Sequence, residues 1–189
     1  MGFDLEQMLM DSGALLEGHF LLTSGRHSDR YIEKFRLLER PAALDAAARA
    51  MAAGIDPGNV DVVLGAAIGG ILIAGSVARI LDRRTMFTER VDGKMTLRRG
   101  FELHPADRVL VVEDIVSTGG SLLELLDVVR AAGATIERVA CLVDRTIDGL
   151  NLDAPTVVLH RMPIASWVPD NCPLCAQNIP LTKPGRSGK

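Results

Sequence analysis

The stretch that decides the fold reads Arg108-Val-Leu-Val-Val-Glu113-Asp114-Ile-Val-Ser117-Thr118-Gly119-Gly120-Ser121. Its apolar start, Arg108–Val112, predicts a buried strand, and the amphipathic run Ser121–Ala132 predicts a helix that Gly133 ends. Between them lies a turn, Asp114–Gly120, which contains an acid, two hydroxyl residues and two glycines. A strand, a tight turn and a helix in this order form one unit of an α/β sheet.

The same alternation continues on both sides of this stretch. Buried strands are predicted at Val60–Leu64 and Ile136–Val143 and a short strand at Thr85–Thr88, while helices are predicted at Pro41–Ala53 and Ile71–Leu81. Strands that alternate with helices at this pace predict a central, mainly parallel sheet with helices on both faces. We therefore expect an α/β fold.

The N-terminal part departs from this alternation. A first helix is predicted from Leu5 to Leu15, and Gly18–Gly25 predicts a short strand that ends in a turn. We expect residues 1–189 to form one domain, with a small hood contributed by about residues 1–40 and by the C-terminal segment.

Bulk properties narrow the possible functions. A net charge of -3 argues against nucleic-acid binding as the main task, and the longest apolar stretch, Ile71–Ala78, is too short to span a bilayer. Residues 1–16 do not read as a signal peptide, and three cysteines favour a reducing compartment. We expect a cytoplasmic protein that binds neither nucleic acid nor membrane.

The turn after Arg108–Val112 has the chemistry to bind a phosphorylated sugar. Backbone N–H groups of the turn and the helix N-terminus attract anions at the carboxyl end of a strand, and glycines allow a close approach. Ser117 and Thr118 add hydroxyl donors. Glu113 and Asp114 would repel a bare phosphate, but they can accept hydrogen bonds from ribose hydroxyls. The alternative is that these acids only end a strand and cap a helix.

This string resembles the phosphoribosyl pyrophosphate signature of the type I phosphoribosyltransferases. The resemblance implies that family's fold, with a central mainly parallel sheet flanked by helices and a small N-terminal hood. It also implies Mg²⁺ as cofactor, bound mainly through the substrate, and a catalytic role for Asp114. The implied phosphoribosyl pyrophosphate contacts in this segment are Glu113, Asp114, Ile115, Val116, Ser117, Thr118, Gly119, Gly120 and Ser121.

A second turn follows the strand at Val60–Leu64 and reads Gly65-Ala-Ala-Ile68-Gly69-Gly70. The resemblance implies that this turn binds the pyrophosphate group through Ile68 and Gly69. Many family members have a lysine where this chain has Gly69. The alternative is that the small residues only pack a strand against a helix.

Two segments indicate which base is accepted. Gly18-His-Phe-Leu-Leu-Thr-Ser-Gly-Arg26-His27-Ser28 resembles the hood segment of orotate phosphoribosyltransferases, and Leu142-Val-Asp-Arg145 resembles that family's Val-Asp-Arg segment. The resemblance implies that Arg145 pairs with the orotate carboxylate, a role that suits a planar guanidinium. Ser117 and His27 are the other implied orotate contacts. The alternative for Arg145 is a surface ion pair.

The charged segment Glu89–Gly100 is expected to be a loop between strands, with Gly93 and Gly100 as possible hinges. The resemblance implies a lid that reaches the neighbouring subunit's site in a homodimer. Arg90 and Lys94 would then stabilise the leaving pyrophosphate, and Arg90 would bind phosphoribosyl pyrophosphate. The alternative is a solvated hairpin without a catalytic role.

Together these resemblances imply a glycosyltransferase of the pentosyltransferase type, an orotate phosphoribosyltransferase of pyrimidine biosynthesis. Its substrates would be phosphoribosyl pyrophosphate and orotate, and its products orotidine 5'-phosphate and pyrophosphate. Two alternatives stay open: a purine-base phosphoribosyltransferase, and a non-catalytic regulator that senses phosphoribosyl pyrophosphate.

The tail contains Cys172-Pro-Leu-Cys175, which has the spacing of a zinc knuckle. One such pair supplies only two ligands, and His160 is a conceivable third. Cys141 lies within a predicted strand and is expected in the core. The alternative is a pair of thiols packed near a turn without a metal.

Overall fold

The structure is a computed structural model that describes residues 3–22 and 24–184. Its centre is a six-stranded sheet in the order β5-β4-β3-β6-β7-β8, in which β5 alone runs antiparallel to its neighbour. The strands are β3 (Val62–Ala66), β4 (Arg84–Val91), β5 (Lys94–Leu97), β6 (Arg108–Val116), β7 (Thr135–Asp144) and β8 (Thr156–Arg161). This confirms the predicted α/β class and the mainly parallel sheet.

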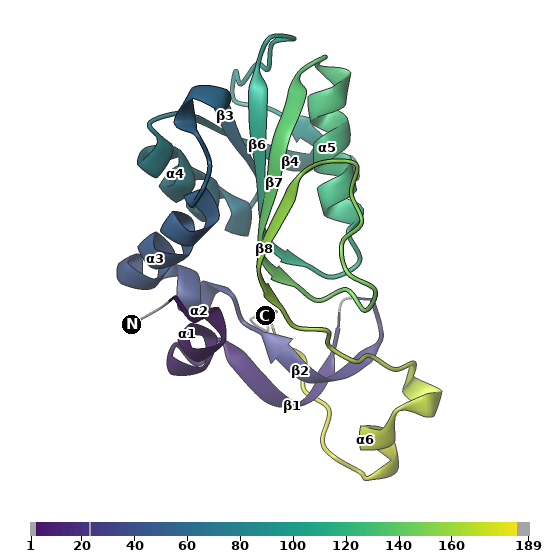
Figure 1. The fold of residues 1–189 in the computed structure, drawn as a ribbon. Coiled ribbons are helices and arrows are strands. Elements are labelled where there is room, and N and C mark those ends of the chain that lie inside the picture. The colour runs from purple at the N-terminus through teal and green to yellow at the C-terminus, as the bar shows by residue number, and fades with distance from the viewer. Residues whose placement is uncertain (1–2, 23, 185–189) are drawn as a thin grey trace.

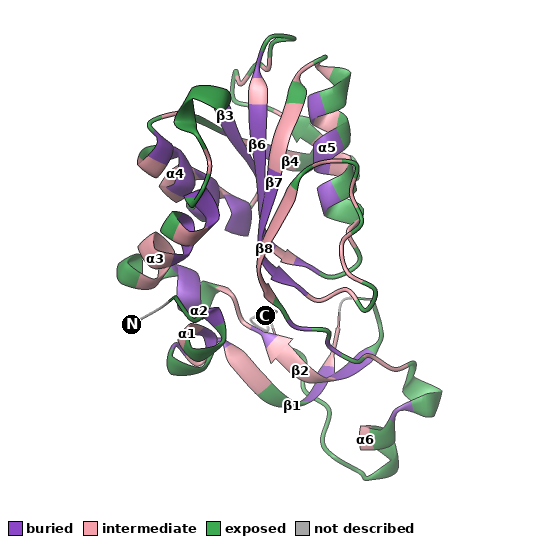
Figure 2. Ribbon diagram, viewed as in Figure 1, coloured by how far each residue is buried: buried purple, intermediate pink, exposed green. Residues whose placement is uncertain are grey.

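Helices cover both faces of the sheet. α3 (Pro41–Ala52) and α4 (Gly69–Leu81) lie on one face, and α5 (Gly120–Ala131) lies on the other (Figure 1). Successive side chains of β6 point to opposite faces of the sheet and so contribute to two hydrophobic cores. Leu110 packs beneath α3 and α4, whereas Val111 packs beneath α5. Figure 2 shows the resulting burial of the central strands. No helix within the described residues is long and apolar enough to cross a bilayer.

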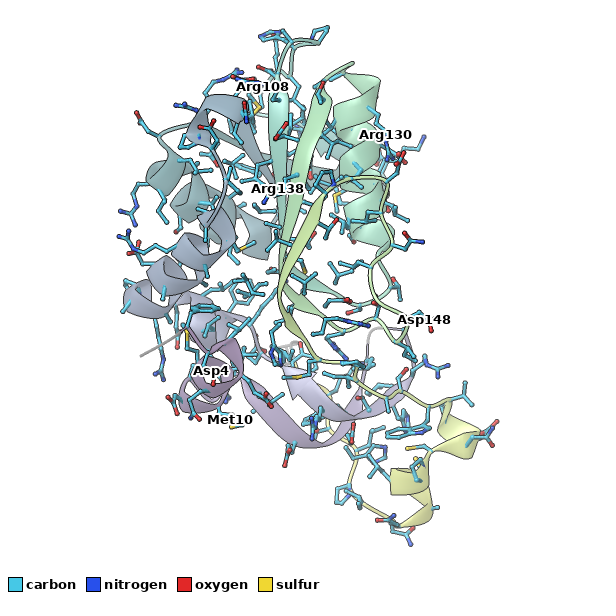
Figure 3. The ribbon with its side chains drawn as sticks, in the orientation of Figure 1. Asp4, Met10, Arg108, Arg130, Arg138 and Asp148 are labelled. Atoms are coloured by element: carbon cyan, nitrogen blue, oxygen red, sulfur yellow. The ribbon has the colours of Figure 1, made fainter. Side chains whose placement is uncertain are left out.

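A hood covers the carboxyl end of the parallel strands. It contains α1 (Leu5–Asp11), the antiparallel pair β1 (Leu15–Leu21) and β2 (His27–Ile32), and α2 (Phe35–Leu38). The C-terminal segment adds η2 (Pro169–Asn171) and α6 (Pro173–Ala176), and Leu21 N donates to the Thr182 carbonyl at 2.8 Å. Arg108, at the start of β6, lies at the end of the sheet opposite the hood (Figure 3), where it contacts Asn59 of η1 (Pro57–Asn59); β6 therefore points its carboxyl end at the hood.

Three sequence expectations need correction. The first helix does not reach Leu15 but ends at Asp11, and Leu15 begins β1. β6 does not end at Val112 but continues to Val116, because it pairs with β7 along that length; Glu113 and Asp114 are therefore strand residues. The segment expected as a loop is mostly a hairpin of β4 and β5. Its turn residues Asp92 and Gly93 have φ of 48° and 81°, the pair of positive values that suits a tight hairpin turn.

Candidate active site

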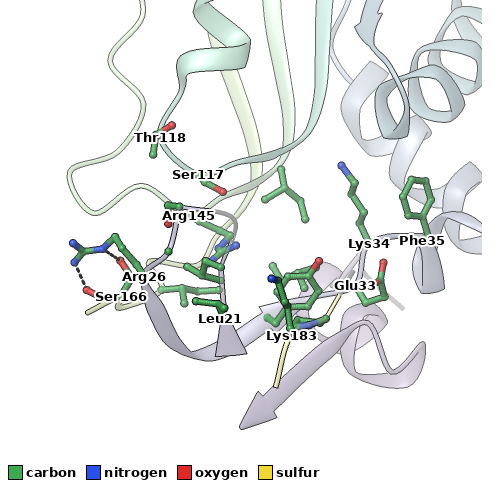
Figure 4. A pocket seen from close by; sticks show the side chains of 18 residues that line it. Leu21, Arg26, Glu33, Lys34, Phe35, Ser117, Thr118, Arg145, Ser166 and Lys183 are labelled. Carbon is green, nitrogen blue, oxygen red and sulfur yellow. Dashed lines mark hydrogen bonds between the residues drawn. The ribbon is translucent and has the colours of Figure 1, made fainter. Parts of the chain in front are cut away.

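A cavity of about 1300 Å³ lies between the hood and the carboxyl ends of β6 and β7. Figure 4 shows Ser117, Thr118 and Arg145 on one side, Lys34 and Glu33 on another, and Arg26 hydrogen-bonded to Ser166. Its other described lining residues come from the hood, from the strand ends and from the C-terminal segment: Leu21, Leu22, Ser24, Gly25, Tyr31, Ile32, Phe35, Ile115, Ile164, Lys183 and Pro184.

The turn between β6 and α5 forms a smaller pocket of about 120 Å³, lined by Glu113, by Leu122 and by every residue from Ile115 to Ser121. Gly119 precedes α5 with φ of 83°, a conformation that glycine adopts without steric cost, and it offers no side-chain cap. The N–H groups of the first turn of α5 therefore remain available to an anion. Apart from Asp114, the predicted donor contacts between Glu113 and Ser121 therefore lie around one concavity.

Glu113 and Asp114 are buried, with 7% and 1% of their surface exposed. Glu113 Oε1 accepts a hydrogen bond from Asp114 N, and Asp114 Oδ1 accepts one from Ile115 N at 2.6 Å. The second oxygens, Glu113 Oε2 and Asp114 Oδ2, have no hydrogen-bond partner among the described residues. Burial, and then the negative charge of Asp114, raise the pKa of Glu113 to about 8.

Lys34 is a site residue that sequence reasoning missed. Its Nζ lies 2.7 Å from Asp114 Oδ2; the contact is a close ion pair without the direction of a good hydrogen bond. A Cβ at Gly69 would lie 1.7 Å from Asp114 Oδ2 and 3.0 Å from Lys34 Cε. The absence of a side chain at Gly69 thus leaves room for both groups. Lys34 stands in a stretch without clear periodicity, and only the tertiary fold brings it here.

The second predicted turn, between β3 and α4, serves packing as well. A Cβ on Gly65 would lie 2.5 Å from the Gly70 carbonyl oxygen, so the close approach of strand and helix requires glycine. Ile68 is 73% exposed at the start of α4. The packing alternative and the ligand-binding prediction are therefore compatible within one turn.

Arg145 lies at the end of β7 and lines the large cavity. Its backbone N donates to the Val116 carbonyl at 2.8 Å, and the buried Asp144 carboxylate accepts hydrogen bonds from Thr146 N and Oγ1. The Nε atom of Arg145 is buried and has no hydrogen-bond partner in the described part of the chain. Burial lowers the pKa of Arg145. A surface ion pair does not account for this environment.

Three predicted site residues lie elsewhere. His27 does not line the cavity: it is buried, and its Nδ1 faces His19 and Cys175, so the structure does not support it as an orotate contact. Arg90 and Lys94 line neither pocket. Arg90 instead donates to both carboxylate oxygens of Glu124 on α5, at 2.9 and 3.1 Å.

The comparison with known proteins first identifies the class of protein. The profile of a family described as "Phosphoribosyl transferase domain" matches residues 36–174. The chain is 43% identical over 182 residues to an orotate phosphoribosyltransferase of Pelotomaculum thermopropionicum, with 96% of each protein covered. It is 47% identical over 177 residues to that of Heliobacterium modesticaldum, with 93% of each covered.

Solved structures agree with these relatives. A crystal structure of orotate phosphoribosyltransferase from Aeropyrum pernix matches with a TM-score of 0.71 and 27% identity, over 84% of this chain and 94% of that one. The chain belongs to the orotate phosphoribosyltransferase family.

Proposed function

We propose that this chain transfers ribose-5-phosphate from phosphoribosyl pyrophosphate to orotate, giving orotidine 5'-phosphate and pyrophosphate in pyrimidine biosynthesis. One observation carries this proposal: the wall of a single cavity holds both the Ser117–Thr118 turn and the unpaired guanidinium of Arg145. In this reaction the bond from ribose C1 to pyrophosphate breaks. A bond from C1 to a ring nitrogen of orotate forms, and that nitrogen loses its proton.

The pocket at the start of α5 would hold the 5-phosphate of the donor. Its volume of about 120 Å³ suits a phosphate group. Backbone N–H groups at a helix N-terminus favour negative charge, and the hydroxyls of Ser117, Thr118 and Ser121 supply further donors. These interactions fix one end of the sugar and thereby align C1 with the base.

Glu113 and Asp114 would bind the ribose. Each presents a buried oxygen without a hydrogen-bond partner, and these oxygens can accept hydrogen bonds from the two ribose hydroxyls. The negative charge of Asp114 would also stabilise the positive charge that develops at C1 as pyrophosphate departs. Carboxylate oxygens fit Mg²⁺, a hard cation, bound through the donor. When bound, Mg²⁺ would supply positive charge that stabilises the departing pyrophosphate.

Lys34 and the Ile68–Gly69 turn would hold the pyrophosphate. Lys34 Nζ already stands beside Asp114, and its stem occupies the space next to Gly69. Many family members have a lysine at the position of Gly69; in this chain Lys34 would supply a cation to the same space from the hood.

Arg145 and Ser117 would bind orotate. The guanidinium of Arg145 is buried in part, lacks a partner at Nε and lines the cavity beside Ser117. A carboxylate is the ligand that matches its planar set of donors. A base without a carboxylate would leave this charge unpaired, which gives the site its selectivity.

The β4–β5 hairpin would act as a lid in a homodimer. Within one chain Arg90 and Lys94 do not line the cavity, so a catalytic role requires the hairpin of a neighbouring subunit. The Arg90–Glu124 pair is exposed at both ends and holds the hairpin weakly, by less than about 1 kcal/mol. Closure would bring the two cations to the departing pyrophosphate and exclude water.

One experiment separates the candidate functions. The purified chain is assayed with phosphoribosyl pyrophosphate, Mg²⁺ and, in turn, orotate, uracil, adenine, hypoxanthine and xanthine. Release of pyrophosphate that is much faster with orotate than with any other base supports the proposal. Turnover with a purine base would identify a purine enzyme instead, and calorimetric binding of the donor without turnover of any base would identify a sensor. A reducing, cytoplasmic location stays a prediction.

A further inference from the structure

Four side chains outside the cavity converge on one point. His19 on β1 and His27 on β2 meet Cys172, which lies between η2 and α6, and Cys175 in α6. Their ligand atoms all lie within 4.8 Å of one another, and three of the four residues are buried. The two pairs are separated by more than 140 residues of sequence, yet they face each other across the junction of the hood and the C-terminal segment.

Four of the six distances between these atoms are close to those of a tetrahedral metal site. A zinc ion with bonds of about 2.3 Å to sulfur and about 2.0 Å to nitrogen has ligand atoms about 3.3–3.8 Å apart. His27 Nδ1 lies 3.3 Å from Cys175 Sγ, and His19 Nε2 lies 3.5 Å from Cys172 Sγ and 3.8 Å from Cys175 Sγ. The two histidine nitrogens, 2.9 Å apart, need only separate by a few tenths of an ångström.

The surroundings prepare His19 to act as a ligand. Its Nδ1 lies 2.8 Å from the Ile179 carbonyl oxygen, which can only accept a hydrogen bond. The proton is therefore on Nδ1, and the lone pair of Nε2 is directed into the cluster. Histidine ligands of metals typically donate their other N–H to a carbonyl or carboxylate in this way.

The C-terminal segment lacks the apolar burial that would otherwise hold it in place. From residue 169 to residue 184, the only buried residue is Cys172 (Figure 2). A segment of this kind gains its order from backbone hydrogen bonds, such as Leu21 N to the Thr182 carbonyl, or from a metal. Cys172, the one buried residue of this segment, is itself a member of the cluster.

We propose that His19, His27, Cys172 and Cys175 bind a structural Zn²⁺ ion that joins the C-terminal segment to the hood. The set of two thiolates and two imidazoles is one that zinc accepts in closed structural sites. The third ligand considered from the sequence, His160, lies next to Glu6 instead, and Cys141 is buried in β7. Lys183, near the end of the same segment, lines the large cavity. An ion that holds this segment in place would therefore also support the active site.

The test is the zinc content of the full chain, purified without an affinity tag or chelator and measured by plasma mass spectrometry. We expect one zinc ion per chain. Cys175→Ser and His27→Ala should each lose it. His160→Gln and Cys141→Ala, which remove a histidine and a cysteine outside the cluster, should keep it. Zinc content does not depend on the base that is used, so this result stands apart from the proposed activity.

Two further measurements apply if a ligand variant fails to fold. The parent chain, stripped of metal and supplied with Co²⁺, should show the visible absorption of tetrahedral cobalt with thiolate ligands. Its C-terminal segment should become more sensitive to protease when zinc is removed and less sensitive when zinc returns. A parent chain that contains neither zinc nor this cobalt spectrum would overturn the proposal, as would a Cys172–Cys175 disulfide in its intact mass or full zinc retention in Cys175→Ser.

Discussion

The unpaired guanidinium of Arg145 leads to a prediction in two parts. Its removal should stabilise the ligand-free protein and at the same time lower the turnover of orotate. A buried donor without a partner costs about 1–3 kcal/mol, and Nε of Arg145 is in that condition in the free protein. Methionine has a similar length and no charge, and it adapts to irregular spaces. Arg145→Met should therefore raise the free energy of unfolding of the ligand-free protein by about 1 kcal/mol or more.

Orotate turnover should change in the other direction. The variant loses charge-assisted hydrogen bonds to the orotate carboxylate, worth about 2–4 kcal/mol together, which corresponds to about 30- to 1000-fold in kcat/KM. Uracil lacks this carboxylate, so its slow turnover should change little. The ratio of kcat/KM for orotate to that for uracil should thus fall by nearly the same factor.

The assay pairs denaturant unfolding without ligand with initial rates on both bases. Arg130→Met is the matched control, because Arg130 forms an exposed pair with Asp127 on α5 and its loss should affect neither quantity by more than about 1 kcal/mol. An unchanged orotate-to-uracil ratio in Arg145→Met would refute the role of the guanidinium. A variant that is less stable and loses both activities equally would show that Arg145 has a structural role.

Three shorter predictions concern the donor side. Asp114→Asn should keep the fold but abolish calorimetric binding of phosphoribosyl pyrophosphate; an unchanged affinity would exclude Asp114 from the donor site. Arg90→Ala should lower turnover far more than orotate affinity, and steady-state rates equal to those of the parent would reject the lid. Glu113, whose pKa rises from 4.5 to about 8 on folding, keeps a proton that the unfolded chain releases, so stability should fall as pH rises through that interval and level off above it. Glu113→Gln should remove this slope of up to about 1.4 kcal/mol per pH unit, and parallel pH–stability curves for parent and variant would contradict the assignment.

Local sequence determined much of the fold because its signals are short-range. The apolar strand of β6, the glycines after it and the amphipathic α5 lie within one continuous stretch, and the structure follows them to within a few residues. The extension of β6 through Val116 depends on pairing with β7, which local periodicity does not report. The hairpin has a strong local turn signal in Asp92-Gly93, whereas the high charge of the segment around it favours an exposed loop.

Residues that act through distant partners were out of reach of sequence reasoning. The cysteine pair could be recognised from its spacing, but His19 and His27 join it only because β1 and β2 pack beside α6. For the same reason, the sequence around His27 indicates the orotate contact that the resemblance implies and not its position beside Cys175. Lys34 likewise belongs to the site only through Asp114, which is 80 residues away in the chain. In the folded protein Lys34 Nζ lies 2.7 Å from Asp114 Oδ2.

The unpaired polar atoms of this protein mark its site. Within the described residues, three buried side-chain atoms lack a hydrogen-bond partner: Glu113 Oε2, Asp114 Oδ2 and Arg145 Nε. A protein core rarely tolerates such atoms, because each costs folding free energy. Glu113 and Arg145 line the two adjoining pockets. Asp114 follows Glu113 in β6, and its Oδ2 lies 2.7 Å from Lys34 Nζ. On the proposed function, the carboxyl groups of Glu113 and Asp114 and the guanidinium of Arg145 are held ready for hydroxyl groups at one end and a carboxylate at the other, which is what a ribosyl donor and orotate present together.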